Sequence, residues 1–126
     1  MKVLHQTYEI NASIDKVWDA LVNPKQIDKW GGGKAKMSEE IGFEFELWDG
    51  EIHGKNIKVV KNEKLVQEWY SGIWDKPSIV TFLLKQVGDK TIVDLKQIDI
   101  PDTEARDIED GWQDYYMEPL KKLLES

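Results

Sequence analysis

The sequence predicts an α+β domain in which a curved antiparallel sheet of about six to seven strands wraps around a long C-terminal helix. Three observations predict this fold. Apolar and polar residues alternate with period two from Lys34 to Ile100, which is typical of antiparallel strands joined by turns. Two short helical patterns follow the first strand, and one long helical pattern ends the chain. The 126 residues suit one domain, 1–126, with a single core.

The N-terminal part is predicted to form a strand followed by two short helices. Residues 2–10 are rich in Val, Thr, Tyr and Ile, which favour strands. A helix capped by Ser13 follows and ends before Pro24. Its apolar residues recur at the spacing of one buried helix face: Ile14, Val17, Trp18 and Leu21. Residues 24–30 predict a second helix with Pro in its first turn, and Gly31–Gly33 end it.

The central part predicts the other strands. Alternation at Phe43–Leu47 predicts a strand, and Asp49-Gly50 predicts a tight type I′ hairpin turn, because both central residues of that turn need positive φ. Further strands are expected at residues 51–60, 64–70, 78–87 and 90–100. Ser71–Pro77 is expected to be a loop carrying Ile73 and Trp74. This apolar pair could anchor a partner, cover a cavity mouth, or pack back on the sheet.

The last helix is predicted to begin with Asp102 or Thr103 as its N-cap. Acidic residues crowd its first turns and lysines lie near its end, a polarity that suits the helix dipole. Gly111 and Pro119 fall inside the helix and cost roughly 1 and 3 kcal/mol in helix propensity, so we expect a kink near Pro119. Apolar residues recur every four positions and predict a face packed on the sheet: Ile108, Trp112, Tyr116, Leu120 and Leu124.

Composition argues against several classes of function. The formal net charge is −7, from 17 Lys and Arg against 24 Asp and Glu, so a nucleic-acid partner is not expected. The chain has no cysteine, which excludes disulfides, thiolate metal sites and cysteine nucleophiles and suits a reducing compartment. No stretch approaches the roughly 20 apolar residues of a membrane span, and the N-terminus lacks the apolar stretch of a signal peptide. We therefore expect a cytoplasmic protein.

Carboxylates and histidine on the early strands have structural explanations simpler than catalysis. Asp49, Glu51 and His53 have the i, i+2, i+4 spacing that could bring three metal ligands to one strand face, but Asp49 is better explained as a turn residue. Glu44 and Glu46 alternate with apolar residues, so they are expected on the solvent face rather than as an acid–base pair. We expect no catalytic group, metal or cofactor, and hence a protein that is not an enzyme.

Four segments carry a resemblance to a known family. They are Ile14–Leu21, Asp49-Gly50 with Gly54, Leu65–Trp69, and Gly111-Trp112 before Pro119–Lys121. In this order they resemble the C-terminal-type domain of the heat-shock-protein-90 ATPase activator homologues, which belong to the START-like (SRPBCC), helix-grip superfamily. The resemblance covers nearly the whole chain and implies the helix-grip fold. It also implies either an apolar ligand beneath the last helix or a co-chaperone role, although the full activator makes its principal chaperone contact through a separate N-terminal domain.

The aromatic excess, with six Trp in 126 residues, predicts either a well-filled core or the lining of a ligand cavity. Trp18, Trp48 and Trp74 are assigned to the first helix, the hairpin edge and a loop. Gln97 shares a strand face with apolar neighbours, so it is expected to face the last helix and either make a buried hydrogen bond or contact a ligand. The candidate cavity residues are Trp30, Trp69, Gln97, Trp112, Tyr116 and Leu120.

Three functions remain open at this point. The first is a non-enzymatic domain that holds an apolar small molecule between the sheet and the C-terminal helix. The second, which the resemblance implies, is an accessory co-chaperone that contacts or stimulates a heat-shock-protein-90-type ATPase. The third is a small cyclase or lyase similar to the polyketide cyclases of the superfamily. It requires His5 or His53 to face the cavity with a shifted pKa.

Overall fold

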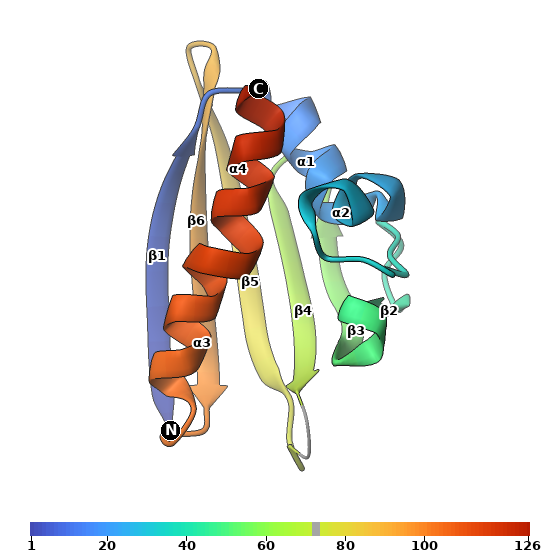
Figure 1. Ribbon diagram of the computed structural model, residues 1–126, viewed down its shortest axis with the longest axis vertical. Coiled ribbons are helices and arrows are strands. Elements are labelled where there is room, and N and C mark those ends of the chain that lie inside the picture. The colour runs from blue at the N-terminus through green and yellow to red at the C-terminus, as the bar shows by residue number, and fades with distance from the viewer. Residues whose placement is uncertain (72–73) are drawn as a thin grey trace.

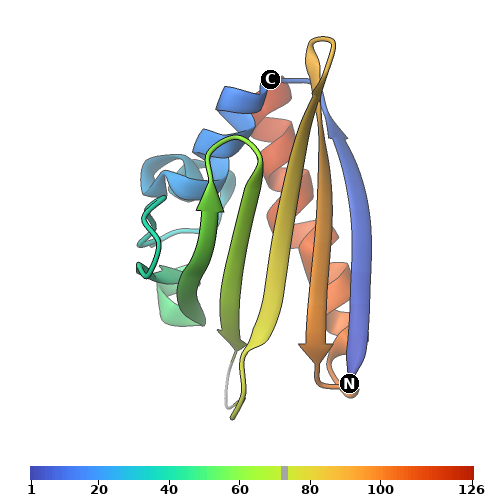
Figure 2. The same ribbon diagram turned by 180° about the vertical axis from the view of Figure 1, so that it is seen from behind.

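The computed structural model describes residues 1–71 and 74–126, so Ile73 of the expected loop lies outside the described residues. In the described residues, six strands form one antiparallel sheet in the order β1-β6-β5-β4-β3-β2, which confirms the predicted fold class (Figure 1). The strands are β1 (Lys2–Ile10), β2 (Glu44–Leu47), β3 (Ile52–Val60), β4 (Lys64–Ser71), β5 (Ser78–Val87) and β6 (Lys90–Ile100). The helices lie on one face of the sheet, and the view from behind shows the other face uncovered (Figure 2).

Helices α1 (Ile14–Val22) and α2 (Pro24–Trp30) follow the first strand, as predicted. Ser13 stands at the N-cap of α1, but its side chain makes no capping hydrogen bond with the described backbone. Asn23 caps α2, because its side chain accepts a hydrogen bond from the Lys25 N–H at 3.0 Å. Gly31 ends α2 with a φ of 109°, a left-handed conformation that glycine adopts without a steric penalty.

The connection between β2 and β3 is wider than the sequence predicts. Leu47 pairs with Ile52, so the whole stretch 48–51 lies in the turn and the expected two-residue type I′ turn is wrong. Asp49 and Gly50 have the predicted positive φ values, 57° and 92°, but Trp48 also has a φ of 50°. A positive φ is rare for a bulky residue and costs of the order of 1 kcal/mol or more. The turn widens because Trp48 leaves the strand.

The C-terminal helix is interrupted before Pro119 rather than at it. It comprises α3 (Ala105–Gly111), a π-helical segment (Trp112–Met117) and α4 (Glu118–Glu125). The Glu118 N–H donates to the carbonyl of Gln113, five residues earlier, which is the π-helical spacing. Pro119 therefore lies in the first turn of α4, where its missing N–H is tolerated. The predicted N-cap is wrong, since Glu104 holds that position and α3 begins without a side-chain cap in the described residues.

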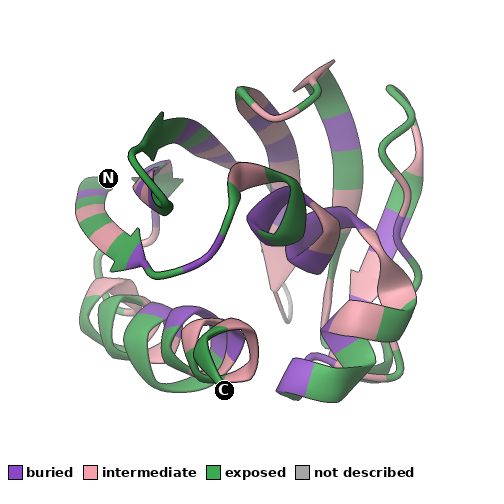
Figure 3. Ribbon diagram, turned by 90° about the horizontal axis from the view of Figure 1, so that it is seen from above, coloured by how far each residue is buried: buried purple, intermediate pink, exposed green. Residues whose placement is uncertain are grey.

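The core lies between the sheet and the helices. Viewed from above, the strands curve around the helical layer, and the C-terminal helix shows buried positions toward the sheet and exposed positions on its outer side (Figure 3). Along β4 the buried residues alternate as Leu65, Gln67 and Trp69, so one face of this strand points into the core. No described helix is long and apolar enough to cross a bilayer.

Candidate functional site

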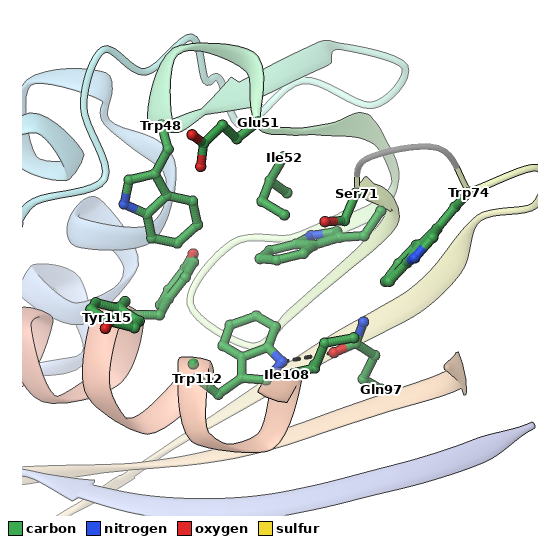
Figure 4. Close-up of a pocket in the computed structure, with 12 residues that line it drawn as sticks. Trp48, Glu51, Ile52, Ser71, Trp74, Gln97, Ile108, Trp112 and Tyr115 are labelled. Atoms are coloured by element: carbon green, nitrogen blue, oxygen red, sulfur yellow. Dashed lines mark hydrogen bonds between the residues drawn. The ribbon is translucent and has the colours of Figure 1, made fainter. Parts of the chain in front are cut away.

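A cavity of about 370 Å³ lies between the sheet and the C-terminal helix (Figure 4). This volume falls in the range of small-molecule sites. The cavity opens to solvent at a rim where Glu51 and Tyr115 are exposed. Its walls are mainly aromatic and apolar, and they are formed by Trp48, Glu51, Ile52, Trp69, Ser71, Trp74, Gln97, Ile108, Gly111, Trp112, Tyr115 and Tyr116.

Four of the six predicted cavity residues line this cavity: Trp69, Gln97, Trp112 and Tyr116. Trp30 and Leu120 do not line it and are buried in the core beside it. The Trp30 indole N–H donates to the carbonyl of Ala20 at 2.9 Å, and its ring lies 4.5 Å from that of Tyr116. Trp30 therefore packs against a residue of the cavity wall without reaching the cavity itself.

Two tryptophans that the sequence assigned elsewhere also line the cavity. Trp48 packs edge-on against Tyr116, with ring centroids 6.3 Å apart. The Trp74 indole N–H donates to the carboxylate of Glu104, just before α3. Trp74 lies in the loop expected for it, and its side chain lines the cavity. Figure 4 shows Trp48 and Trp74 on opposite sides of the cavity, with Trp112 below them.

A chain of hydrogen bonds holds Trp112 to the sheet. The Trp112 indole N–H donates to Gln97 Oε1 at 2.7 Å, and Gln97 Nε2 donates to Ser78 Oγ at 2.9 Å. Ser78 Oγ in turn donates to the carbonyl of Ile98. Ser78 and Gln97 are buried, and these hydrogen bonds give each of their side chains a partner. Gln97 thus makes the buried hydrogen bond foreseen for it and fixes the position of one cavity wall.

A second chain, which the sequence reasoning missed, holds Trp69 in the same way. The Trp69 indole N–H donates to Gln67 Oε1 at 2.8 Å, and Gln67 Nε2 donates to Asn56 Oδ1 at 2.9 Å. Asn56 Nδ2 then donates to the carbonyls of Ser38 and Glu40 at 2.7 and 3.1 Å. The signal was available, because Gln67 and Asn56 are polar residues at inward positions of their strands.

Tyr116 is the centre of the aromatic cluster. Its ring lies 4.7 Å from that of Trp112 and 6.1 Å from that of Trp69. Its hydroxyl is buried and has no hydrogen-bond partner among the described residues. Burial raises the pKa of the Tyr116 phenol, because the charged phenolate would lose its hydration. Tyr116 thus lines the cavity and carries a neutral hydroxyl that has no partner among the described residues.

Replacing Tyr116 by Phe tests this description of the hydroxyl. An unsatisfied buried polar group costs about 1 to 3 kcal/mol, so Tyr116→Phe should raise the free energy of unfolding at pH 7 by about 1 kcal/mol. Urea denaturation measures this change. A loss of more than about 1 kcal/mol would contradict it, since that loss requires a hydroxyl with a good partner.

The same variant has a predicted pH signature. Above about pH 10 the phenol ionises in the unfolded chain while folded Tyr116 keeps its proton, so the folded state binds more protons and stability falls as the pH rises. Burial, followed by the carboxylates of Glu118 and Asp114, raises the pKa of Tyr8 to about 12 and adds to this fall. Tyr116→Phe should make the loss of stability from pH 10 to 11 shallower. An unchanged slope would contradict this assignment.

Both histidines lie away from the cavity. His5 is 62% exposed at its side chain and its Nε2 lies 3.5 Å from Asp94, while His53 is exposed and stacks on Tyr70 with centroids 5.4 Å apart. Glu44 is exposed and Glu46 pairs with Lys36, as expected for a solvent-facing strand side. Among the described residues, no three His, Asp or Glu side chains are arranged to hold a metal ion.

Comparisons with known proteins agree with this fold. Residues 11–125 match the family described as "Activator of Hsp90 ATPase homolog 1-like protein". The mouse activator of 90 kDa heat shock protein ATPase homolog 2 is 24% identical over 124 residues, covering 97% of this chain and 38% of that protein. The Dictyostelium discoideum activator homolog is 28% identical over 123 residues, covering 95% and 32%. The chain thus spans roughly a third of the length of these relatives.

Solved structures with low sequence identity share the fold. An Hsp90 activator from Plasmodium falciparum superposes with a TM-score of 0.91 at 20% identity, covering 99% of this chain and 97% of that one. The Aha1 dimer from Colwellia psychrerythraea gives a TM-score of 0.84 at 20% identity, with coverage of 99% and 97%. With the match over residues 11–125, these findings show that the chain belongs to the Activator of Hsp90 ATPase homolog 1-like family of helix-grip domains.

Proposed function

We propose that this domain binds a small, largely apolar molecule in the cavity between its sheet and its C-terminal helix. The observation that carries the proposal is the cavity itself, about 370 Å³ in volume and lined mainly by aromatic side chains. Such concave apolar sites with a few polar groups are the usual form of small-molecule binding sites. The two tryptophan-anchoring hydrogen-bond chains support it, because they hold the walls in place before a ligand arrives.

The proposed role is binding rather than catalysis. Among the described lining residues, the ionisable side chains are Glu51, Tyr115 and Tyr116, and burial keeps Tyr116 protonated. The exposed positions of His5 and His53 argue against a histidine-based cyclase. A cytoplasmic location, expected from the composition, stays a prediction.

Tryptophan fluorescence tests the binding proposal directly. Titration with a panel of hydrophobic dyes and fatty acids should quench the emission saturably, because four of the six tryptophans line the cavity. Gly111→Leu is the variant designed to block the cavity. Gly111 lines the cavity with a helical φ of −63°, and a Cβ there would meet no atom within 4 Å, so a side chain has room to begin at this position.

Gly111→Leu should keep the domain folded and raise the Kd at least tenfold. Its thermal midpoint should not fall, since leucine is a better helix former than glycine by about 1 kcal/mol. Equal quenching of the wild type and the variant would place binding elsewhere and remove the proposal.

A second candidate function is a contact with a heat-shock-protein-90-type ATPase. Membership of the family and the names of the mouse and Dictyostelium relatives favour it. Because the chain spans roughly a third of those proteins, their activity is carried over here only as a proposal. The purified chain should stimulate such an ATPase. The absence of any effect at large molar excess would remove this candidate.

A further inference from the structure

The walls of the cavity are aromatic to an unusual degree and carry charge of one sign. Four tryptophans and two tyrosines line it. Glu51 is the only charged residue among its described lining residues, and no lysine or arginine is among them. The faces of aromatic rings are electron-rich and attract cations. The aromatic walls and the carboxylate of Glu51 therefore both favour a positively charged ligand.

The rings surround the space rather than forming one wall. Figure 4 shows Trp48, Trp112 and Trp74 on three sides of it, with Glu51 beside Trp48 at the edge. The indole N–H groups of Trp69, Trp74 and Trp112 already donate to protein oxygens. These N–H groups are thus occupied, so a ligand meets the carbon atoms of these rings rather than a free indole donor.

The charges around the cavity disfavour an anion. An anionic ligand finds no basic lining residue in the described part of the chain, and it would lie against ring faces and near Glu51. The overall net charge of −7 also attracts cations to the protein surface.

We propose that the preferred ligand of this cavity is a small organic ammonium cation, with its charged group among the tryptophan faces and Glu51 as counter-charge at the rim. This inference rests on the proposed binding function and adds the charge of the ligand. Cation–π attraction is largest when water is excluded from the cation. Glu51 is exposed and its charge is screened by solvent, so its share of the selectivity is the smaller one.

Two probes of equal shape separate charge from apolar contact. Phenyltrimethylammonium and tert-butylbenzene differ only in a quaternary nitrogen in place of a carbon. Tryptophan fluorescence and ligand-observed NMR at low ionic strength should give a Kd for the cation about tenfold below that of the neutral probe. An anionic aromatic probe, phenylacetate, should bind more weakly than either.

Two charge-removing variants identify the counter-charge. Glu51→Gln should raise the Kd of the cation about threefold and leave that of tert-butylbenzene unchanged. Glu63→Gln removes the same charge in the turn after β3, at the end of that strand away from Glu51, and should change neither Kd. An unchanged cation Kd in Glu51→Gln would overturn the role of Glu51.

The outcomes also separate this inference from the proposed function. Saturable binding of tert-butylbenzene with equal or weaker binding of the cation overturns the cation preference and leaves the binding function standing. Tighter binding of the cation, lost in Gly111→Leu, supports both. If neither probe binds, both the inference and the proposed function are overturned.

Discussion

Gly54→Ala should lower the free energy of unfolding by about 3 kcal/mol or more, a very large effect for one added methyl group. A Cβ on Gly54 would lie 1.7 Å from the backbone carbonyl oxygen of Glu68 and 3.0 Å from the ring of Phe45. The first contact is far inside van der Waals distance and involves backbone, so strands β3 and β4 would have to separate locally. Urea denaturation measures the loss, and an unchanged m-value shows that the change is one of stability.

Gly54 also accounts for a feature of the cavity wall. It pairs with Phe45 on one neighbouring strand and with Trp69 on the other. Without a side chain between them, the rings of Phe45 and Trp69 approach to 6.1 Å across β3. The aromatic cover over a strand glycine is a known way of stabilising such a position. A Cβ here would press on the Glu68 carbonyl, next to Trp69 in the chain, and on the Phe45 ring that packs on Trp69, so Gly54→Ala should weaken ligand binding as well as stability.

Gly111→Ala is the matched control for this prediction. Gly111 has a helical φ of −63°, and an added Cβ would meet no atom within 4 Å. The same chemical change should therefore stabilise the domain, by about 0.5 to 1 kcal/mol, because alanine loses less backbone entropy than glycine on folding. Similar effects of the two substitutions would contradict the argument from strand spacing.

The extended part of the fold was predictable because its signal is local. The bounds expected for residues 2–10, 78–87 and 90–100 coincide with β1, β5 and β6. In each of these strands one face is largely buried, so a period of two in burial appears directly as a period of two in the sequence. Proline and glycine marked the limits of α2 in the same way, at Pro24 and Gly31.

Features set by tertiary packing were not predictable from these patterns. Trp48 adopts a positive φ that its residue type disfavours, and its ring packs on Trp30 and Tyr116, contacts that join distant segments. The π-helical segment before Pro119 places Trp112 and Tyr116 in the core. Neither feature has a local sequence signature, so a two-residue hairpin turn was expected in error and the π-helical segment was not foreseen.

The candidate site was partly predictable for a related reason. Gln97 was identified because a polar residue at an inward strand position needs a partner, and its neighbour Trp112 supplies one. The same rule applies to Gln67 and Asn56, which the sequence reasoning passed over. Trp74 was assigned to a loop, but its place at the cavity could not be predicted, since it depends on how that loop packs against the rest of the domain.

Trp112→Ala should produce the other large effect, a loss of about 3 to 5 kcal/mol in the free energy of unfolding. Trp112 is 3% exposed, and its ring lies 4.7 Å from both Trp69 and Tyr116. Alanine removes these contacts, leaves Gln97 Oε1 without its donor and opens one wall of the cavity. Ligand-induced quenching should be lost with it, although this variant alone cannot separate packing from hydrogen bonding.

Trp112→Phe and Gln97→Leu make that separation through a double-mutant cycle. Each single variant leaves one buried partner of the 2.7 Å hydrogen bond unpaired and should lower the free energy of unfolding by about 1 to 3 kcal/mol. The double variant removes both partners, so it should cost less than the sum of the single variants, with a coupling of at least about 1 kcal/mol. Urea denaturation of the four proteins measures the coupling. Strict additivity would show that the Gln97 amide does not hold Trp112 in place, and that packing alone forms this wall of the cavity.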